Sequence, residues 1–436
     1  MSLIAKLFAR QKTRKTPLQK QRQGVPVHQE VVKRKISSHE LQIGMTVIDL
    51  DRPWTDLPFI FQEVTISTEK ELDVFRRYCQ HVYIDYTSLK LHREQQIANL
   101  RQQIRYKMEA SSARKVQKSL KKELPKAKKA FDSSKHHIQE VMQQVQKDGH
   151  INVEQSKVLV SQCVSSILSN PSAMFWMTKI KDQDEYTAEH CLRVGILAIT
   201  FGRHLQLSEE ELHLLGLCGM LHDVGKMKIP NSILNKQSAL TEQEFDIVKE
   251  HAVLGYIFLK EHGGIDEVVC TAAYNHHESL VGDGYPRQLD AAYLSVYDKI
   301  IAIVDSYDAM TSDRCYRKGM SPEKATAILY KEANHRYDKY LVKEFIKMVG
   351  VYPVGSLIKL NNGFYAIVLS VNPDSKLAPV VEIIADENKI PLKRRIAFDL
   401  SKQKKYKGQV LKIASSVSDT EIDLEVSNYI EKAVAI

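Results

Sequence analysis

Histidine and aspartate side chains that could hold metal ions are concentrated in the middle of this 436-residue chain. His222 and Asp223 are adjacent in the segment LHDVGK, and His276 and His277 precede a glutamate in NHHES. Three further candidates lie in separate segments: His190 in DEYTAEH, His251 in KEHAVLG and Asp305 in IVDSYDAMT. Imidazole and carboxylate ligands without a thiolate suit iron or manganese better than a structural zinc site. The set therefore predicts a metal centre.

The adjacent His222-Asp223 pair indicates which chemistry such a centre would perform. Two neighbouring donors at the end of a helix can point into one cavity, where the carboxylate of Asp223 can bridge two cations. Two divalent ions about 3.5–4 Å apart hold a bridging hydroxide and lower its pKa toward neutrality, which is the chemistry of phosphoester hydrolysis. A histidine taken singly is more often an ordinary core or surface residue, and His204, His213 and His262 are interpreted in that way.

Helices must position these candidates, because the apolar pattern from 151 to 349 is helical almost throughout. The pattern predicts helices near 187–205, 208–222, 242–260, 265–277 and 291–311. Thr241 and Glu244 have the spacing of a capping box, which predicts the start of the helix that carries His251. The expected fold class is multidomain, with a mainly all-α helical catalytic domain, a small α+β N-terminal domain and a small β C-terminal extension.

The motifs along the helical segment resemble those of an HD-GYP domain, a branch of the HD phosphohydrolase superfamily. The resemblance runs from Asp184 to Arg317 and contains, in order, YTAEH, HDVGKMKIP, ILNK, LTEQE, HAVLGY, NHHES, GDGYP and VDSYDAMTSDRCYRKGMS. The segment 36–86, with LQIGM and LDRPWTDLPFIFQ, is similar to a domain of undefined function that is often found before HD-GYP domains. Together these resemblances cover about half of the chain.

The resemblance implies a set of metal ligands, residue by residue. The family's ligand positions are occupied here by His190, His222, Asp223, His251, His276, His277 and Asp305. Glu185 stands where some members have an acidic residue that helps to hold a third metal; the other interpretation is a charge that complements a helix dipole. Asp308 follows Asp305 by one turn and is expected to form a hydrogen bond to a ligand. Two or three divalent ions, with iron or manganese favoured, are the expected cofactors.

Three basic residues are expected to contact the substrate. Lys226 follows Asp223 in a glycine-containing turn, where its ammonium could stabilise the charge that develops on a scissile phosphate. A surface salt bridge is the alternative for Lys226. Arg314 and Arg317 occupy positions that look like guanine contacts in the family, where the second is often lysine.

The GDGYP segment is expected to form a tight loop beside the substrate. Gly284 would let the backbone approach a ligand closely, and Pro286 would fix the bend. Tyr285 offers an aromatic face and a hydroxyl group. Taken alone, a G-Y-P tripeptide is usually an ordinary turn, so its value here comes from its place after the His276-His277 cluster.

The resemblance implies a metal-dependent phosphodiesterase that hydrolyses cyclic di-GMP. A metal-bridging hydroxide would attack one phosphorus in line and the 3′ oxygen would leave, which gives linear pGpG, with GMP as a further product. Asp223 and Lys226 are then the catalytic residues. Three alternatives remain: 3′,3′-cyclic GMP-AMP as the substrate, a non-catalytic nucleotide-responsive module, and a nucleotidase acting on mononucleotides. The intact ligand set argues against the second alternative, and the GYP loop argues against the third.

The whole chain is expected to divide into five parts. These are a disordered basic tail (1–35), a small α+β domain with a regulatory role (36–86), a helical connector (87–150), the HD-GYP domain (151–349) and a small β extension (350–436). The pattern in 36–86 predicts the order strand, strand, helix, strand, with Ile43, Met45 and Val47 alternating on the first strand. In the last part, Asn362-Gly363 predicts a hairpin turn.

The connector is expected to be helical and to be interrupted at Pro125. Ile97, Leu100 and Ile104 form a short apolar stripe on it, which predicts packing on itself or on a second subunit. A homodimer is therefore one expected assembly.

The net charge of the chain is +9, and its excess of basic residues is localised in two short segments that carry +9 and +8, while the remainder is acidic. Residues 1–35 contain ten Lys or Arg residues and one acidic residue. Residues 105–130 contain ten Lys or Arg residues and two acidic residues. A solvated tail and a solvated helix face are the first interpretation, and peripheral contact with an anionic membrane surface or partner is the second. The charge does not form a domain-wide patch, so duplex nucleic acid is not an expected partner.

Two further features bear on where the protein works. No apolar run reaches the roughly 20 residues that a transmembrane segment needs. The six cysteines are scattered without a CxxC pair, which suits a reducing compartment and predicts a cytoplasmic protein.

Overall fold

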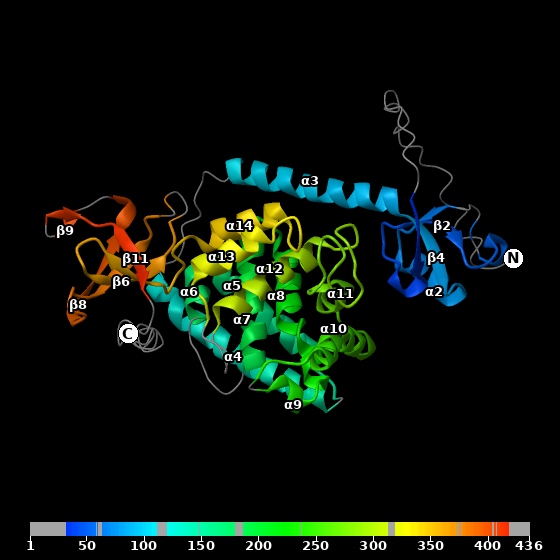
Figure 1. Cartoon of the computed structure of the whole chain (residues 1–436), viewed down its shortest axis with the longest axis horizontal. Helices are drawn as coiled ribbons and strands as arrows, with labels where there is room; N and C mark the ends of the chain where they lie inside the picture. The colour runs from blue at the N-terminus through cyan, green and yellow to red at the C-terminus, as the bar shows by residue number, and fades with distance from the viewer. Residues whose placement is uncertain are drawn as a thin grey trace, which may run out of the picture. The chain divides into compact units, whose positions relative to one another are not determined.

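The structure of the protein is a computed structural model (Figure 1). It describes residues 32–417 except 58, 60–62, 111–119, 148, 179–185, 237, 313–318, 373–374, 376, 403–404 and 407. The described chain divides into two compact units, which meet in the sequence between Leu100 and Arg101. The predicted fold class is confirmed, because a helical domain stands between N-terminal and C-terminal segments that contain small antiparallel sheets.

The N-terminal unit is built on a four-stranded antiparallel sheet in the order β1-β4-β2-β3. Its elements are β1 (Lys33–Ser37), η2 (Ser38–Glu40), β2 (Thr46–Leu50), η3 (Trp54–Asp56), β3 (Val64–Thr65), α2 (Glu69–Tyr78) and β4 (His81–Asp85). Helix α2 begins at a capping box of Thr68 and Glu71 and buries Leu72 and Phe75. Phe75 is fully buried, so the core of this unit lies between α2 and the sheet.

Two predictions for this unit were wrong. Lys33–Lys35 were assigned to a disordered tail, but they belong to β1, an edge strand that pairs with β4. An edge strand tolerates charged side chains because its outer side faces water. Ile43 was placed on a strand, but it lies in a turn before β2 and is 48% exposed, whereas Met45 and Val47 are buried. The remainder of the predicted tail lies outside the described residues.

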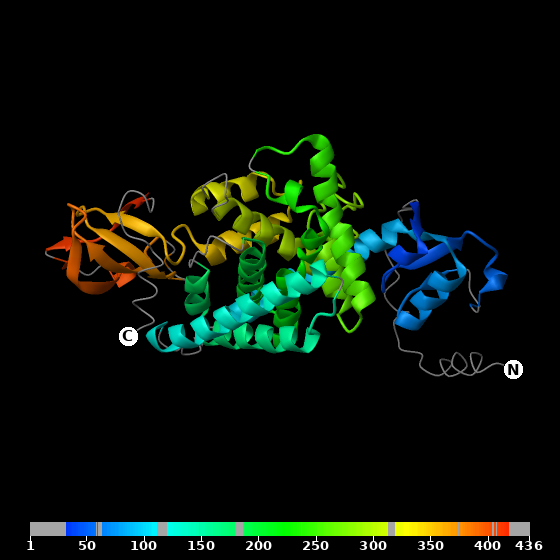
Figure 2. The same cartoon turned by 90° about the horizontal axis from the view of Figure 1, so that it is seen from below.

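The segment predicted to be a connector contains two long helices, α3 (Tyr86–Ala110) and α4 (Leu120–Gln146). Helix α4 differs from the prediction, because it packs on α5 (Val153–Ser169), α6 (Pro171–Met177) and α7 (Tyr186–His204) as part of the helical domain (Figure 2). Pro125 lies within α4 and does not interrupt it. Proline removes one backbone hydrogen bond, and the buried apolar face of α4 outweighs that loss. In the predicted stripe, Ile97 is half-buried, and the side chains of Leu100 and Ile104 lie outside the described residues.

Helices α7, α8 and α12 pack against one another at the centre of the helical domain (Figures 1 and 2). Its elements after α4 are α5 (Val153–Ser169), α6 (Pro171–Met177), α7 (Tyr186–His204), α8 (Glu209–Leu221), η4 (Val224–Lys228), α9 (Asn231–Leu234), α10 (Glu242–His262), α11 (Glu267–Asn275), α12 (Val296–Thr311), α13 (Pro322–Lys331) and α14 (Lys339–Val349). The predicted helices are confirmed, although α12 starts later than predicted because Ser295 and Asp298 form its capping box.

The C-terminal segment forms a five-stranded antiparallel sheet in the order β11-β5-β6-β7-β8. Its elements are β5 (Leu357–Leu360), β6 (Tyr365–Ser370), β7 (Val380–Ala385), β8 (Pro391–Asp399), η5 (Leu400–Lys402) and β11 (Ile413–Val417), with β9 (Lys405–Tyr406) and β10 (Gln409–Val410) as a separate ribbon. The predicted hairpin at Asn362-Gly363 is confirmed by the pairing of β5 with β6. Strand β8 was missed because its Lys-Arg-Arg run obscures the alternation of apolar residues.

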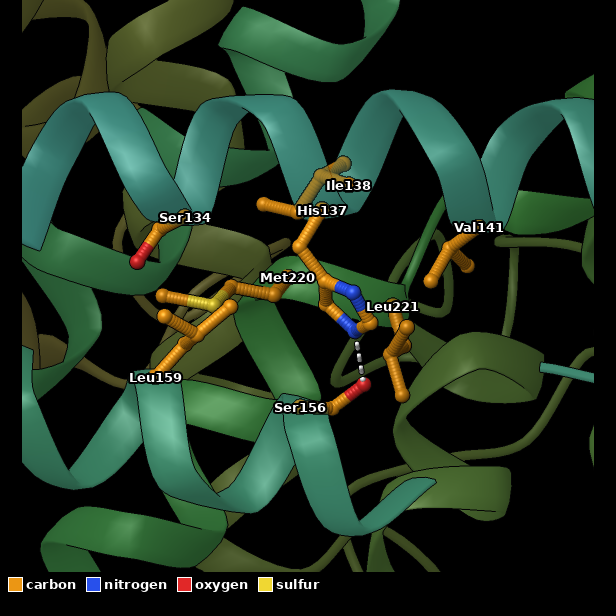
Figure 3. A pocket seen from close by; sticks show the side chains of 8 residues that line it. All are labelled: Ser134, His137, Ile138, Val141, Ser156, Leu159, Met220 and Leu221. Atoms are coloured by element: carbon orange, nitrogen blue, oxygen red, sulfur yellow. Dashed lines mark hydrogen bonds between the residues drawn. The ribbon is translucent and has the colours of Figure 1, made fainter. Parts of the chain in front are cut away.

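A narrow gap lies between α4, α5 and α8, close to the end of α8 (Figure 3). Its lining residues are Ser134, His137, Ile138, Val141, Ser156, Leu159, Met220 and Leu221. Its free volume of about 10 Å³ is at the lower limit for one water molecule, so it is not a substrate site. His137 projects from α4 into the gap, where its Nε2 lies 2.8 Å from Ser156 Oγ.

Among the described helices, none is long and apolar enough to cross a membrane.

A close backbone contact joins η4 to α10. A Cβ atom added at Gly225 would lie 2.0 Å from the carbonyl oxygen of His251 and 2.5 Å from the nitrogen of Gly255. Backbone atoms cannot move aside as a flexible side chain can, so only glycine fits at position 225. Across the same contact, a Cβ atom at Gly255 would meet its nearest neighbour at 3.3 Å, which is tight but tolerable.

We expect Gly225→Ala to lower the free energy of unfolding by about 1–3 kcal/mol, because the added methyl group overpacks the contact between η4 and α10. Gly255→Ala is the matched control, and we expect it to change stability by less than about 1 kcal/mol, since alanine also favours the helix. Urea unfolding of both variants, followed by far-UV circular dichroism, measures the difference. Equal stabilities for the two variants would contradict this account of the contact.

Candidate metal centre

Separate elements of the helical domain bring the seven predicted ligands to one buried place. His190 comes from α7, His222 caps the C-terminus of α8, Asp223 begins η4, His251 comes from α10, His276 and His277 follow α11, and Asp305 comes from α12. All except His277 are buried, and His277 is half-buried. Local signals in the sequence set where three of these helices begin, because capping boxes start α8, α10 and α12.

The carboxylate of Asp223 lies between two groups of imidazoles. Its Oδ2 is 3.5 Å from His190 Nε2 and 3.4 Å from His222 Nε2. Its Oδ1 is 3.3 Å from His251 Nε2 and 3.6 Å from His276 Nε2. Each oxygen of one carboxylate therefore faces a different pair of ring nitrogens, which is the arrangement a bridging ligand requires.

One further residue completes each group. Asp305 Oδ1 lies 3.1 Å from His190 Nε2 and 3.8 Å from His222 Nε2. His277 lies with the other pair, and one ligand atom from each of the three histidines falls within 4.8 Å of the others. We call the group of His190, His222 and Asp305 the first half of the centre. The group of His251, His276 and His277 is the second half, and Asp223 joins the two.

Backbone carbonyls fix the orientation of three of the imidazoles. The Nδ1 of His222 lies 2.8 Å from Gly219 O, that of His251 lies 2.6 Å from Val248 O, and that of His276 lies 2.9 Å from Ala273 O. A carbonyl oxygen only accepts, so each Nδ1 carries a proton and each Nε2 faces the centre. Metal-binding histidines are typically held in this way.

A buried chain of alternating charges holds the fourth imidazole, that of His190. Its Nδ1 lies 2.9 Å from Asp308 Oδ2, which confirms the expected hydrogen bond. Arg193 donates to Asp308 Oδ1 at 3.0 Å and to Glu189 Oε2 at 3.3 Å. Lys135 of α4 donates to Glu189 Oε1 at 2.7 Å. The chain therefore connects α4, α7 and α12 to one ligand.

Charge favours a cation at this place. Burial alone would raise the pKa of Asp223, but Lys226 and His222 hold it well below its ordinary value. The pKa of Asp305 is likewise held well below its ordinary value, since hydrogen bonds with the neighbouring histidines outweigh its burial. Burial lowers the pKa of His251 to about 3, so this imidazole is neutral near pH 7. Anionic carboxylates and neutral imidazoles are the protonation states that bind metal.

The residues fit divalent cations on two counts. Among the described residues, the buried atoms His222 Nε2, Asp223 Oδ1 and His277 Nδ1 have no hydrogen-bond partner. Orphaned buried polar atoms are costly, and coordination to a cation removes that cost. The donor set of nitrogen and oxygen atoms also suits iron or manganese. The domain thus has the His and Asp groups of a metal-dependent enzyme.

Lys226 lies at the edge of this cluster, where its ammonium forms an ion pair with Asp223. The lysine side chain is 22% exposed, so one side of it faces the surface. Burial would lower its pKa, but the carboxylates of Asp223 and Asp305 raise it above the ordinary value. The ammonium is therefore charged at neutral pH, next to the carboxylate that joins the two halves.

The GDGYP loop packs on the second half of the centre. Glu278 accepts from the backbone N–H groups of Arg287 at 2.7 Å and Leu289 at 2.9 Å, which fastens the loop behind the histidines. Gly284 approaches the preceding turn of the chain closely, because a Cβ atom there would lie 2.5 Å from Ser279 N.

Tyr285 stacks on the ring of His277, with centroids 4.6 Å apart and planes at 30°. Its hydroxyl stays protonated, because burial raises its pKa. Pro286 follows in the same half-buried loop, after a cis peptide bond. The loop therefore presents an aromatic ring directly beside a candidate ligand.

Three predicted site residues, Glu185, Arg314 and Arg317, lie outside the described residues. The three histidines interpreted as ordinary residues lie away from the cluster. His204 pairs with Glu344, His213 bonds to the backbone of its own helix, and His262 accepts from Ile151 N.

Sequence reasoning predicted the role of Asp308 but missed the other members of the chain that holds His190. Arg193 was not singled out, although its spacing contained a signal: His190 and Arg193 are one turn apart on α7, and their partners Asp305 and Asp308 are one turn apart on α12. Matched spacings of this kind bring two pairs together when the helices pack. Lys135 carried no comparable signal, because α4 was assigned to the connector.

Comparisons with known proteins agree with this site. The family described as "HD domain" matches residues 165–341, and a domain of unknown function (DUF3391) matches residues 33–156. A cyclic di-GMP phosphodiesterase of Pseudomonas aeruginosa is 30% identical over 366 residues, which are 83% of this chain and 88% of that protein. The chain belongs to the HD-GYP family of cyclic dinucleotide phosphodiesterases.

Two other members of this family match shorter segments of the chain. The cyclic di-GMP phosphodiesterase PdeB of Borreliella burgdorferi is 26% identical over 205 residues, which are 47% of this chain and 54% of that protein. The 3′3′-cGAMP-specific phosphodiesterase 1 of Vibrio cholerae is 35% identical over 162 residues, which are 37% of each chain. Relatives of this chain thus bear the names of enzymes with different cyclic dinucleotide substrates.

We expect Asp308→Asn to weaken the binding of Mn²⁺ by about 10- to 100-fold, because an amide holds the His190 imidazole less firmly than a carboxylate. Glu344→Gln is the matched control, since Glu344 pairs with His204 outside the centre. Equilibrium dialysis with Mn²⁺ measures both affinities without an activity assay. Equal affinities for the two variants would show that the bond between Asp308 and His190 does not support metal binding.

Proposed function

We propose that this HD-GYP protein hydrolyses cyclic di-GMP to linear pGpG, with GMP as a further product. The observation that carries the proposal is the Asp223 carboxylate, whose two oxygens face separate groups of ligands. The Pseudomonas aeruginosa relative, which matches over most of both chains, bears the name of a cyclic di-GMP phosphodiesterase and supports the choice of substrate.

The cofactors we propose are two divalent ions, iron or manganese. The first half of the centre would hold one ion, the second half would hold the other, and Asp223 would contact both. Bound there, the ions would neutralise charge on the phosphate and lower the pKa of a water molecule that attacks it. Glu185 is proposed to help with a third ion.

The protein's own groups would orient and stabilise the substrate. Lys226 is proposed to contact the scissile phosphate, since its charged ammonium lies beside Asp223 and is partly exposed. Tyr285, in the loop with Gly284 and Pro286, would place an aromatic face next to the reacting diester. Arg314 and Arg317 are proposed to contact guanine.

A second candidate substrate is 3′,3′-cyclic GMP-AMP. The Vibrio cholerae relative named for that nucleotide matches the helical domain at 35% identity, which supports keeping this alternative. It covers only 37% of this chain, so we place cyclic di-GMP first. The rates at which the purified protein hydrolyses the two nucleotides would show which one is the better substrate.

Proposals for the rest of the chain follow from its composition and its parts. The described cysteines are buried free thiols, which supports a reducing compartment and hence the cytoplasm. We propose that the N-terminal α+β domain regulates the HD-GYP domain and that α3 contributes to a homodimer. The basic N-terminal segment is proposed to remain solvated, with contact to an anionic surface as the alternative.

Asp223→Ala tests the proposed function directly. We expect it to lower both the content of bound metal and the rate of cyclic di-GMP hydrolysis, the latter by at least about 100-fold, because one carboxylate serves both halves of the centre. His213→Ala is the control, since its imidazole bonds only to its own helix among the described residues.

Metal analysis of protein purified without oxygen, followed by nucleotide chromatography of the reaction, measures both effects. Full activity of Asp223→Ala at unchanged metal content would contradict the proposed function. Equal metal loss in His213→Ala would indicate misfolding and not the loss of a ligand.

A further inference from the structure

A row of aromatic rings leads from the second half of the metal centre toward solvent. Tyr285 stacks on His277 at 4.6 Å, and Phe245 of α10 meets Tyr285 edge-on, with centroids 6.3 Å apart and planes at 80°. Phe245 is 46% exposed, whereas its neighbour Tyr285 is half-buried. The outermost ring of the row is therefore exposed to solvent.

A basic side chain lies next to the exposed ring. The ammonium of Lys249, one turn further along α10, is 5.3 Å from the centroid of the Phe245 ring. Lys249 also forms an ion pair with Asp246, whose side chain is 69% exposed. Exposed ion pairs contribute little to stability, so the ammonium can exchange Asp246 for a ligand at low cost.

Contacts in the first turn of α10 hold the backbone that carries Phe245 in place. The side chain of Glu244 accepts from the backbone N–H of Thr241 at 2.8 Å, and the Thr241 hydroxyl accepts from the backbone N–H of Glu244 at 3.2 Å. Lys236 also donates to both carboxylate oxygens of Glu244, at 2.8 and 2.6 Å. A rigid aromatic ring loses little conformational entropy when a ligand stacks on it.

A single exposed apolar residue is common and needs no explanation. Phe245 differs because it touches Tyr285, which itself stacks on a candidate metal ligand, and because a cation accompanies it. A cyclic dinucleotide carries a planar base on the nucleotide whose phosphate reacts. An aromatic ring beside the phosphate site can stack on that base, and a lysine can donate to O6 and N7 of guanine.

We propose that Phe245 and Lys249 form a purine-binding surface, which receives one base of the cyclic dinucleotide while its phosphate lies at the metal centre. The inference deepens the proposed function and rests on it. Phe245 would supply stacking for any purine. Lys249 would favour guanine, because adenine presents an amino group where guanine presents O6.

Steady-state kinetics of the full-length, metal-loaded protein tests this surface. The substrates are cyclic di-GMP and methyl p-nitrophenyl phosphate, a diester without a nucleobase. We expect Phe245→Ala and Phe245→Leu to raise KM for cyclic di-GMP by about 5- to 150-fold, the range for loss of one stacked base. The factor by which KM for cyclic di-GMP rises should be at least five times the factor by which KM for the small diester changes. Phe245→Trp should keep KM within about threefold of the wild-type value.

The control is Ile257→Ala, at another exposed position of α10, which is 43% exposed. It should leave KM for both substrates unchanged. For Lys249→Met, we expect the preference for cyclic di-GMP over cyclic di-AMP, which carries no guanine, to fall by about fivefold or more, because one guanine contact is lost.

The contradicting outcomes are distinct. An equal rise of KM for both substrates in Phe245→Ala would show that the ring only supports Tyr285, and this would overturn the inference. Unchanged KM for cyclic di-GMP in that variant, with an active wild-type protein, would overturn it as well. A wild-type protein that hydrolyses the small diester but no cyclic dinucleotide would instead contradict the proposed function itself.

Discussion

The structure of the helical domain depends on one carboxylate, that of Asp223, which is buried among four imidazoles. Burying a charge is costly unless opposite charges or coordinating groups surround it. Here four ring nitrogens approach its two oxygens within 3.6 Å, and Lys226 pairs with it as well. Two cations would complete the balance, because each oxygen already faces its own group of ligands.

The architecture can be understood as the means of bringing these groups together. Capping boxes fix where α8, α10 and α12 begin, so the ligands come at set positions along each helix. The contact between Gly225 and Gly255 then brings η4, and with it Asp223, against α10 beside His251. Backbone carbonyls and Asp308 orient the imidazoles before any cation binds, which is the preorganisation that metal sites need.

The sequence predicted the parts of the site that depend on local order. The adjacent pair His222-Asp223 and the pair His276-His277 stand at helix ends that periodicity and capping residues indicate, and the resemblance to HD-GYP motifs supplied the other ligands. Local sequence patterns could not predict contacts between segments that are distant in the chain. The chain from Lys135 through Glu189 and Arg193 depends on how α4 packs, and α4 was assigned to a connector because its exposed face is rich in lysine. Strand β1 was missed for a similar reason, since its basic residues suit a solvated tail until β4 provides a partner.

The central claim is that Asp223 is shared between two cations, and electron paramagnetic resonance of the Mn²⁺-loaded protein tests it most directly. Two manganese ions that share a carboxylate are magnetically coupled, so we predict that the isolated-ion signal disappears and a coupled spectrum grows as a second equivalent of Mn²⁺ binds. Loss of that coupling in Asp223→Ala would assign it to this residue. A spectrum of isolated Mn²⁺ ions at two bound equivalents of wild-type protein would contradict the account.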